Sequence, residues 1–446
     1  MRSCTPLQDI DSLFEDPLGS TDRVNDPAYG LRWVRDDGPL SVRSEWTVEP
    51  TMDSIIQTLQ KVIDPNKHYI IRHCSNGAYS KIYSVSYDGI HLVLKVYLPV
   101  CPKSMTESEV ATLRWVDRNT RLPVPKVRHY DSSRNNPIGF EWILMDRIEG
   151  LPLFQCWESI TQGAKERIVK QVAEYATICF VKQFHGVGNI YPLESHQSYF
   201  EPLEGEMWTR SRFRLISSEL QLRSNESTNE NHREVISNML DLLDRLRELE
   251  DKFFQPPGHP DGSEPSTYVD ESTDEEDAEA TGVRSKSHEP TMLWHDDISL
   301  DNIFVDENGV LEGIIGWSCV SCIPRYEACQ FPAFLHQAFD RPMEPRTPYR
   351  VTRRQPQSDE EINRYRMELK QYKLTLLRQL FIDEMMQRCP EWVDIFYKQR
   401  YRRDYEAAVQ NCDNEFAYKI VEEWVGDVES SGSISTVWSL HERLMS

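Results

Sequence analysis

Apolar and polar residues alternate through residues 68–98, and this pattern predicts a small antiparallel sheet. The runs Ile82–Tyr87 and His91–Leu98 flank Asp88-Gly89, a strong hairpin signal. Alternation along the second run predicts two faces, with Leu92, Leu94 and Val96 on one and Val93, Lys95 and Tyr97 on the other. Lys95 is therefore an ammonium among apolar neighbours. It either has an anionic partner, because an unpaired buried charge is costly, or snorkels from a sheet edge.

Helical spacing of apolar residues dominates the rest of the chain. One helix is predicted before the sheet, and another follows it, with a capping-box spacing between Thr106 and Glu109. Beyond about residue 149 most of the pattern is helical. A small sheet followed by many helices predicts an α+β fold. The predicted helices are Met52–Ile63, Thr106–Asn119, Lys165–Gln183, Asn231–Phe254, Glu360–Arg388 and Glu391–Asp427.

Two segments lack any such pattern. Residues 1–50 are polar, contain Pro, Asp and Gly, and are predicted to form a loose N-terminal arm. Residues 256–290 are rich in Pro, Gly, Ser and acids, with Asp274-Glu275-Glu276-Asp277 at their centre. That segment buries too little apolar surface to offset its ordering entropy, so we predict a disordered acidic insertion.

Composition and charge restrict the partners and the location that we expect for this chain. The formal net charge of −22 argues against a nucleic-acid partner. The sequence contains no apolar run of about 18 residues and no signal-peptide pattern, so we expect no membrane partner and a cytoplasmic location. Cys319 and Cys322 form a C-x-x-C pair without the second pair that a zinc site needs. Oligomeric state is left open.

The stretch His295–Trp317 carries the clearest chemistry. It begins with H-x-D-x-x-x-x-N, which places His295, Asp297 and Asn302, and continues with strand, turn and strand patterns. It resembles the aminoglycoside phosphotransferase family, small-molecule relatives of the protein kinases. The family has Asp-Trp after the apolar run, whereas this chain has Gly316 before the tryptophan. The run Cys319–Leu335 is similar to fungal members of that family.

The resemblance implies a two-lobed protein-kinase-like fold. We expect an N-lobe with a nucleotide-binding antiparallel sheet at 51–148 and a mainly helical C-lobe at 149–446, which contains the insertion. Gly77 belongs to a loop similar to the one that covers the ATP phosphates in the family, and Lys95 corresponds to the phosphate-binding lysine. Glu109 is expected to pair with that lysine, with Glu107 as the alternative partner, or to act only in capping.

The same resemblance implies the remaining parts of the site. The backbone of Met145, Asp146 and Ile148 corresponds to the hinge that binds the adenine edge. Asp297 is expected to orient and deprotonate an acceptor hydroxyl. His295 is classed with it as catalytic, although bracing of the loop is its main expected role. Asn302 is expected to hold Mg²⁺, and Gly316 stands where the family has its chief metal ligand.

Three hypotheses for function follow. The first is an ATP-dependent phosphotransferase that acts on a hydroxyl of a small molecule of unknown identity. The second is a pseudokinase that binds a nucleotide or partner without turnover, because Gly316 offers no carboxylate for Mg²⁺. The third is an interaction protein that uses the acidic insertion and the C-terminal helices. If the site is otherwise intact, Gly316→Asp is predicted to raise Mg²⁺-dependent ATP affinity or hydrolysis.

Overall fold

The structure is a computed structural model that describes residues 29–35, 42–192, 198–202, 216–218, 220–221, 223–225, 230–254, 290–337, 339–346, 359–431 and 434–445. The chain forms two compact units. The first contains residues 1–205, 291–398 and 445–446, and the second contains residues 206–290 and 399–444. The predicted N-lobe (51–148) falls in the first unit, and the predicted C-lobe (149–446) is divided between the two units. The predicted boundaries at 51 and 149 stay predictions.

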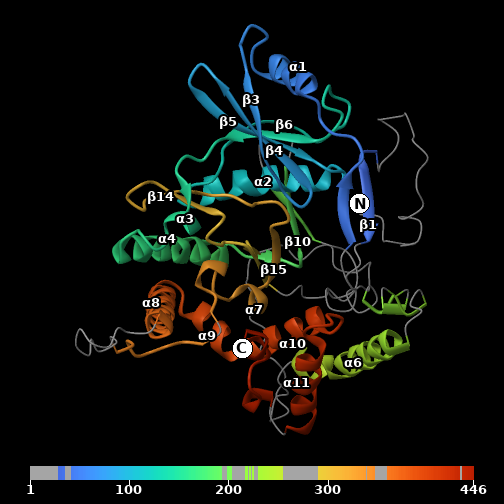
Figure 1. The fold of residues 1–446 in the computed structure, drawn as a ribbon, viewed down its shortest axis with the longest axis vertical. Helices are drawn as coiled ribbons and strands as arrows, with labels where there is room; N and C mark the ends of the chain where they lie inside the picture. Colours follow the sequence, from blue (N-terminus) through green and yellow to red (C-terminus); the bar gives the residue numbers. More distant parts are fainter. Residues whose placement is uncertain are drawn as a thin grey trace, which may run out of the picture. The chain divides into compact units, whose positions relative to one another are not determined.

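A five-stranded antiparallel sheet forms the smaller lobe of the first unit (Figure 1). The predicted hairpin at Asp88-Gly89 is present, and Asp88 and Gly89 both have positive φ values, as such a turn requires. The strands, in spatial order, are β3 (Ile70–Asn76), β4 (Ser80–Tyr87), β5 (Ile90–Tyr97), β7 (Trp142–Asp146) and β6 (Val127–Asp131).

The two faces of this sheet are covered by different helices. Ile55 and Leu59 of α1 (Met52–Val62) are fully buried in one cluster with Leu92, Leu94 and Val96 of β5. On the other face, Val110 of α2 (Ser104–Asn119) clusters with Tyr97 and Ile143. The predicted alternation along β5 is therefore confirmed, and Lys95 faces α2.

The predicted loose arm contains regular structure among its described residues. Strands β1 (Leu31–Arg35) and β2 (Val42–Trp46) pair in antiparallel register, with Trp33 opposite Ser44. Tyr29 and Trp46 pack against the ring of Phe140 from the sheet region. A loose arm is thus wrong for residues 29–35 and 42–46, because aromatic contacts with a distant segment stabilise a hairpin that the local pattern does not signal. Residues 1–28 lie outside the described residues.

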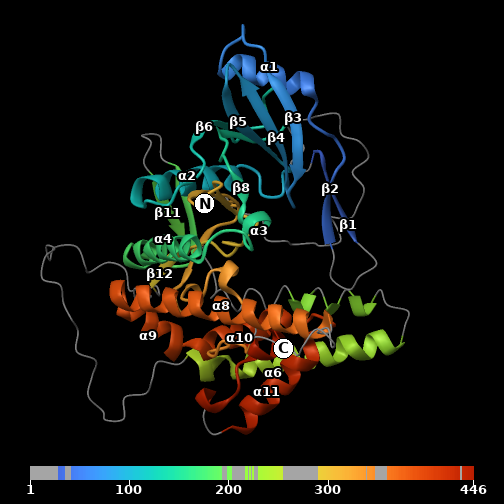
Figure 2. The ribbon, with the colours of Figure 1, turned by 60° about the vertical axis from the view of Figure 1, so that its left-hand side comes forward.

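The larger lobe of the first unit is mainly helical (Figure 2). Helix α4 (Gln162–Val181) begins at the N-cap Thr161 and packs along α8 (Asp359–Arg388), and α9 (Pro390–Lys398) follows α8. A three-stranded sheet carries the segment of interest: β13 (Ile303–Val305) lies between β14 (Leu311–Ile314) and β8 (Leu151–Pro152). This sheet ties the predicted hinge region to the predicted catalytic loop.

Smaller elements complete the larger lobe. Helices α3 (Leu153–Cys156) and α7 (Arg325–Ala328) are single turns. A second five-stranded sheet has the order β11 (Ser198–Pro202), β10 (Gly188–Pro192), β15 (Ser321–Pro324), β12 (Pro290–Trp294) and β9 (Phe184–His185). Strand β12 leads directly into His295, so this sheet sets where the catalytic-type loop begins.

The second unit consists of helices around their own core. Leu246 and Phe253 of α6 (Glu230–Phe254) pack with Tyr405 of α10 (Arg400–Asn411) and Trp424 of α11 (Tyr418–Ser430). Helix α12 (Leu440–Met445) adds Leu440 to this core. The helical pattern predicted over Glu391–Asp427 is divided among α9, α10 and α11. The predicted disordered insertion lies outside the described residues, except Pro290 at the start of β12.

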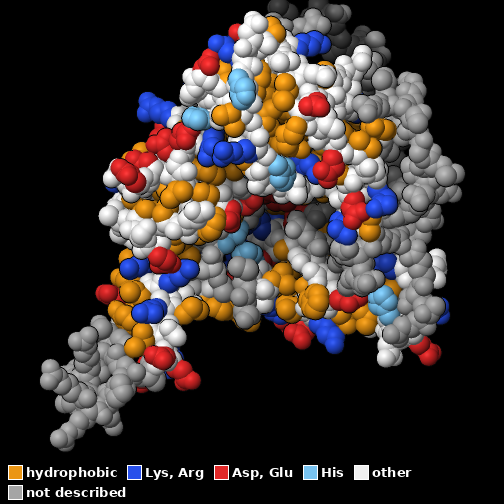
Figure 3. Space-filling view, turned by 45° about the horizontal axis from the view of Figure 1, so that its top comes forward, with side chains coloured by type: hydrophobic (Ala, Val, Ile, Leu, Met, Phe, Trp, Pro, Cys, Tyr) orange, Lys and Arg blue, Asp and Glu red, His pale blue; other side chains and the backbone are white. Residues whose placement is uncertain are grey.

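The architecture is α+β, with antiparallel sheets in the N-terminal part of the first unit and mostly helices beyond it, as predicted. Among the helices that the structure describes, none is long and apolar enough to cross a membrane. Acidic and basic side chains alternate over the face seen in Figure 3, so the acidic excess forms no single continuous field there.

Candidate active site

Lys95 and Glu109 form a buried ion pair between the small sheet and α2. The Lys95 ammonium donates to both carboxylate oxygens of Glu109, at 2.9 and 2.8 Å. The side chains are 11% and 3% exposed, so the attraction is poorly screened. The Tyr97 hydroxyl also donates to Glu109, at 2.6 Å. The predicted partner of Lys95 is therefore confirmed, and α2 begins at Ser104 without a side-chain cap from Thr106.

A third ligand of the Lys95 ammonium comes from the larger lobe. Lys95 donates to the hydroxyl oxygen of Ser318, which follows Gly316-Trp317 in the chain. Burial and the neighbouring Glu109 carboxylate raise the pKa of Tyr97 well above its ordinary value. Because Glu109 and Ser318 both accept from Lys95, its side chain is held in one direction, and its charge lies where the small sheet meets the larger lobe.

Gly77 lies in the turn between β3 and β4, where a phosphate-covering loop is predicted. Its N–H donates to the carbonyl of Ser80 at 2.8 Å, and a Cβ at Gly77 would lie 2.9 Å from the Ser80 hydroxyl oxygen. The N–H of Leu98 donates to the carbonyl of Tyr79 at 2.9 Å, which ties the turn to the end of β5. The turn is compact, and its role with a nucleotide stays a prediction.

The predicted hinge begins with the last residues of β7 and continues beyond it. Met145 is buried, and the N–H of Asp146 donates to the carbonyl of Lys126 at 2.9 Å. The Asp146 carboxylate accepts two hydrogen bonds from Arg128, at 2.6 and 2.8 Å. Ile148 lies beyond the strand, and its side chain fills the space beside Gly313, where a Cβ would lie 2.6 Å from its Cδ1. The hinge segment therefore packs on the hairpin that carries the catalytic-type loop.

The buried side chain of His295 packs against the catalytic-type loop and holds it in place. It is 1% exposed, and its ring packs edge-to-face on Trp317 with ring centroids 4.6 Å apart. The Asp297 N–H donates to Nδ1 at 3.2 Å, which leaves Nε2 to donate to the carbonyl of Ile315 at 3.1 Å. Burial lowers the pKa of His295. A neutral ring engaged at both nitrogens fits the expected bracing role rather than proton transfer.

Asp297 and Asn302 meet at the surface of the loop. The Asn302 side-chain amide donates to the Asp297 carboxylate at 2.7 Å and to the Asp297 carbonyl at 2.9 Å. Asp297 is exposed, so its carboxylate is accessible to a hydroxyl group. The backbone of Asn302 is also fixed, because its carbonyl accepts from the N–H of Ile315 at 2.9 Å.

Gly316 has a conformation that an aspartate adopts only with strain. Its φ is +87°, in the region that favours glycine. A Cβ there would lie 2.9 Å from Nδ2 and 3.1 Å from Cγ of Asn302. Gly316 therefore does more than leave out a carboxylate. The Asn302 side chain occupies the space that a longer side chain at this position would enter. The expectation that Gly316→Asp simply completes the site does not account for this geometry.

These donors do not fit a divalent-metal clamp. Mg²⁺ is usually held by one or two carboxylates together with substrate phosphates. The nearest set is the Asp297 carboxylate, already hydrogen-bonded by Asn302, and the amide oxygen of Asn302. Among the described residues, no group of three or more His, Cys, Asp or Glu side chains is placed to hold a metal ion.

The structure brings most of the predicted residues into one connected network. Lys95 contacts Ser318, whose neighbour Trp317 packs on His295, and His295 is bonded to the backbone of Asp297. Sequence reasoning missed Ser318. A single serine after the apolar run has no distinctive pattern, and only the fold places it beside Lys95. Whether these residues, and those of the loop and hinge, bind nucleotide or catalyse transfer stays a prediction.

This chain belongs to the phosphotransferase enzyme family, whose family model matches residues 70–327. The matched segment includes the small sheet, the catalytic-type loop and the hairpin after it. The resemblance identified from His295–Trp317 is therefore confirmed at the level of the family.

Individual relatives match smaller parts or match weakly. A subtelomeric hrmA-associated cluster protein of Aspergillus fumigatus is 32% identical over 124 residues, which are 27% of this chain and 24% of the relative. Altered inheritance of mitochondria protein 9, mitochondrial, of Meyerozyma guilliermondii is 26% identical over 30% of this chain and 24% of its own length. This chain thus spans about a quarter of both proteins. Clavilactone A biosynthesis cluster protein Y of Ampulloclitocybe clavipes is 21% identical over 65% of this chain and 63% of its own.

Aminoglycoside phosphotransferases are among the solved structures that resemble this chain. A putative aminoglycoside phosphotransferase from Ralstonia eutropha is 10% identical, with 89% of this chain and 98% of that chain covered and a TM-score of 0.43. A thermostable mutant of APH(4)-Ia in a ternary complex with AMP-PNP and hygromycin B is 15% identical, with 85% and 99% covered and a TM-score of 0.42.

Proposed function

We propose that this chain is a pseudokinase-like member of its family, which binds ATP through Lys95 and Glu109 without efficient phosphoryl transfer. The observation that carries the proposal is the glycine-type backbone of Gly316, with the Asn302 amide beside it. Phosphoryl transfer depends on positioned charge around the transferring group. In this chain the phosphate-binding half is complete, whereas the half that would hold Mg²⁺ is not.

The proposed binding mode assigns a task to each group. The Lys95 ammonium contacts the α and β phosphates, and Glu109 with Ser318 fixes its direction. The turn at Gly77 covers the phosphates, and the backbone at Asp146 and Ile148 contacts the adenine edge. Because the Lys95 charge is already buried and oriented, little reorganisation is needed when a phosphate arrives.

Calorimetric titration with ATP in the absence of metal tests this function. Wild-type protein is expected to bind, and Lys95→Met is expected to lose at least tenfold in affinity, because one charge-assisted contact is removed. Lys67→Met is the matched control, since it removes a half-buried lysine that pairs with Asp88 on the same lobe. Equal affinity of all three proteins for ATP would exclude Lys95 as the phosphate-binding group.

A second candidate function is ATP-dependent transfer of phosphate to a hydroxyl of a small molecule. It is favoured by the exposed Asp297 carboxylate, which lies in the loop position of a general base and is oriented by Asn302. The assay is ADP formation with Mg²⁺ and a panel of hydroxylated acceptors. Acceptor-dependent ADP formation that Asp297→Asn abolishes would establish this function over the first.

The proposal includes a cytoplasmic location. The relative from Meyerozyma guilliermondii carries the word mitochondrial in its name, so the mitochondrion is the competing location. Fluorescent fusions at each end of the chain, compared with a mitochondrial marker, distinguish the two.

A further inference from the structure

A cavity of about 360 Å³ lies in the larger lobe between α8, the start of α4 and the Ser299–Asp301 side of the catalytic-type loop. Its volume is within the range of small-molecule sites. None of the four residues of the candidate active site lines it: Lys95, Glu109, Asp297 and Asn302 are all absent from its wall. The cavity is therefore a separate feature, although it shares the loop with that site.

Three lysines from two helices line this cavity: Lys165 of α4, and Lys370 and Lys373 of α8. Lys165 is the unusual one, because it is 8% exposed and its ammonium lies 4.5 Å from the centre of the Trp157 ring. It forms no ion pair with any carboxylate of the described residues. Burial lowers its pKa; the Glu158 carboxylate opposes this shift, and the charges of Lys373 and Lys370 add to it.

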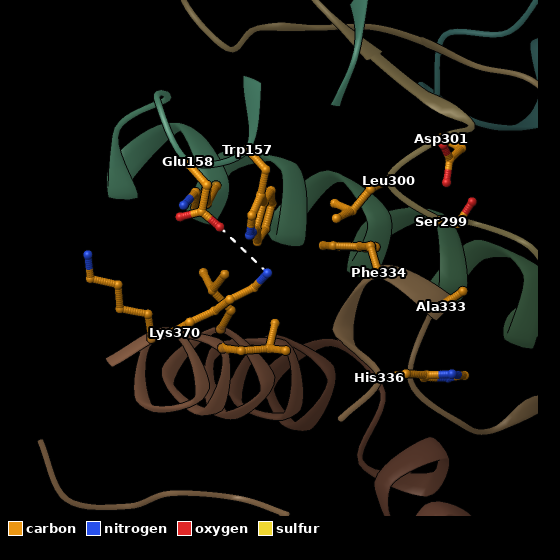
Figure 4. Close-up of a pocket in the computed structure, with 13 residues that line it drawn as sticks. Trp157, Glu158, Ser299, Leu300, Asp301, Ala333, Phe334, His336 and Lys370 are labelled. Carbon is orange, nitrogen blue, oxygen red and sulfur yellow. Dashed lines mark ion pairs between the residues drawn. The ribbon is translucent and has the colours of Figure 1, made fainter. Parts of the chain in front are cut away.

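Carboxylates near the lysines do not balance them. Glu158 is the acid at their end of the cavity, and it pairs with Lys370 at 3.6 Å (Figure 4). Ser299 and Asp301 lie at the opposite end of the same view. The lysine end therefore has an excess of positive charge in a chain with a net charge of −22. Lys165 is buried and shares the one nearby carboxylate with two further lysines, so a negatively charged ligand would offset the cost of burying its charge.

Much of the remaining wall is apolar, although Ser299, Asp301 and His336 also line it. Trp157 and Phe334 pack edge-to-face with ring centroids 6.4 Å apart, and both are buried. Leu300 and Leu377 complete this surface. A ligand that fills the cavity must therefore offer an apolar body together with its charge. An inorganic ion alone would leave this surface without contacts.

We propose that this cavity is a binding site for a small organic anion, whose charged group contacts Lys165, Lys370 and Lys373 and whose apolar body packs on Trp157 and Phe334. The polycationic character of an aminoglycoside is the opposite of what these lysines accept. This site does not depend on the proposed ATP binding, since the two share no side chain.

Calorimetry with three probes that share one apolar body tests the charge requirement. The probes are 3-phenylpropionate, 3-phenyl-1-propanol and 3-phenylpropylamine. The carboxylate is expected to bind at least tenfold more tightly than the alcohol, and the amine is expected to bind most weakly. Equal affinity for the three probes, or no binding of the carboxylate, would overturn the proposal.

Variants of the cavity lysines test whether the anion binds in this cavity. Lys165→Met keeps the length of the side chain and removes the charge, and it is expected to weaken 3-phenylpropionate binding about tenfold. Lys182→Met is the matched control, because Lys182 lies at the C-terminal cap of the same helix and is exposed. If Lys165→Met leaves the affinity for 3-phenylpropionate unchanged, the anion does not bind in this cavity.

The double variant Lys370→Met/Lys373→Met serves if Lys165→Met fails to fold, since these two lysines are exposed. It is expected to weaken binding of the carboxylate by a similar factor, and unchanged binding contradicts the site. ATP affinity measured on the same proteins should remain at the wild-type value. That readout separates failure of this site from failure of the proposed ATP binding.

Discussion

The two halves of the candidate active site differ in how their charges are satisfied. On the sheet side, Lys95 and Glu109 are buried and bonded to each other, with Tyr97 and Ser318 as further partners. On the loop side, Asp297 is exposed and its principal partner is the Asn302 amide. Gly316 adds a backbone conformation that disfavours any side chain, a carboxylate included. On the proposed function, the family motif persists in one half of the site while the chemistry of the other half has changed.

Lys95→Met is expected to have the largest effect on stability. It leaves the Glu109 carboxylate, 3% exposed, without its cation, which should lower the free energy of unfolding by about 3–5 kcal/mol. The double variant Lys95→Met/Glu109→Gln should recover most of that loss, because the buried charge is gone and an acceptor for Tyr97 remains. Urea unfolding of the three proteins measures both values. Additive losses in the double variant would contradict the account of the sheet side.

Gly316→Asp is expected to destabilise the protein without restoring activity. A non-glycine residue at φ of +87°, with the Asn302 amide in its way, should lower the free energy of unfolding by about 1–3 kcal/mol. Gly316→Ala is the control that carries the same strain without a carboxylate. Thermal unfolding and ATP hydrolysis measure the two properties. A gain in Mg²⁺-dependent hydrolysis in the aspartate variant alone would support the prediction made from the sequence.

Asn302→Ala is expected to have a smaller effect. It removes two hydrogen bonds to Asp297 and should lower the free energy of unfolding by about 1 kcal/mol. ATP affinity should not change, because Asn302 serves the loop and holds no metal in this account. Calorimetry with and without Mg²⁺ checks this. A loss of affinity that occurs only with Mg²⁺ would show that Asn302 is a metal ligand.

The burial of His295 predicts a modest pH dependence of the free energy of unfolding. Burial lowers its folded-state pKa below the ordinary value of about 6.5, so the unfolded chain binds a proton more readily. The neutral, buried ring contributes fully to the free energy of unfolding above pH 6.5, and this contribution declines as the pH falls below that value. His295→Gln keeps a donor for the Ile315 carbonyl and removes the titration. Urea midpoints from pH 7.5 to 5 should therefore converge for the two proteins, and a constant difference would contradict this cause.

Local patterns predicted most of the small sheet, because alternation and a hairpin turn are encoded within a few residues. The position of Lys95 among apolar neighbours on one strand favoured an anionic partner, although it left open a lysine that snorkels from a sheet edge. The hairpin of β1 and β2 was not predictable, since its stability depends on contacts of Tyr29 and Trp46 with the distant Phe140. Ser318 and the conformation of Gly316 likewise depend on how the two lobes meet, which no single stretch of sequence encodes.

The metal dependence of ATP affinity tests the central claim most directly. The same wild-type protein is titrated with ATP in excess Mg²⁺ and in EDTA, with ADP release followed in the Mg²⁺ sample. A complete phosphate-binding half and an incomplete metal-binding half predict similar affinity in both conditions and negligible ADP release. Affinity that requires Mg²⁺, accompanied by steady ADP release, would contradict the claim.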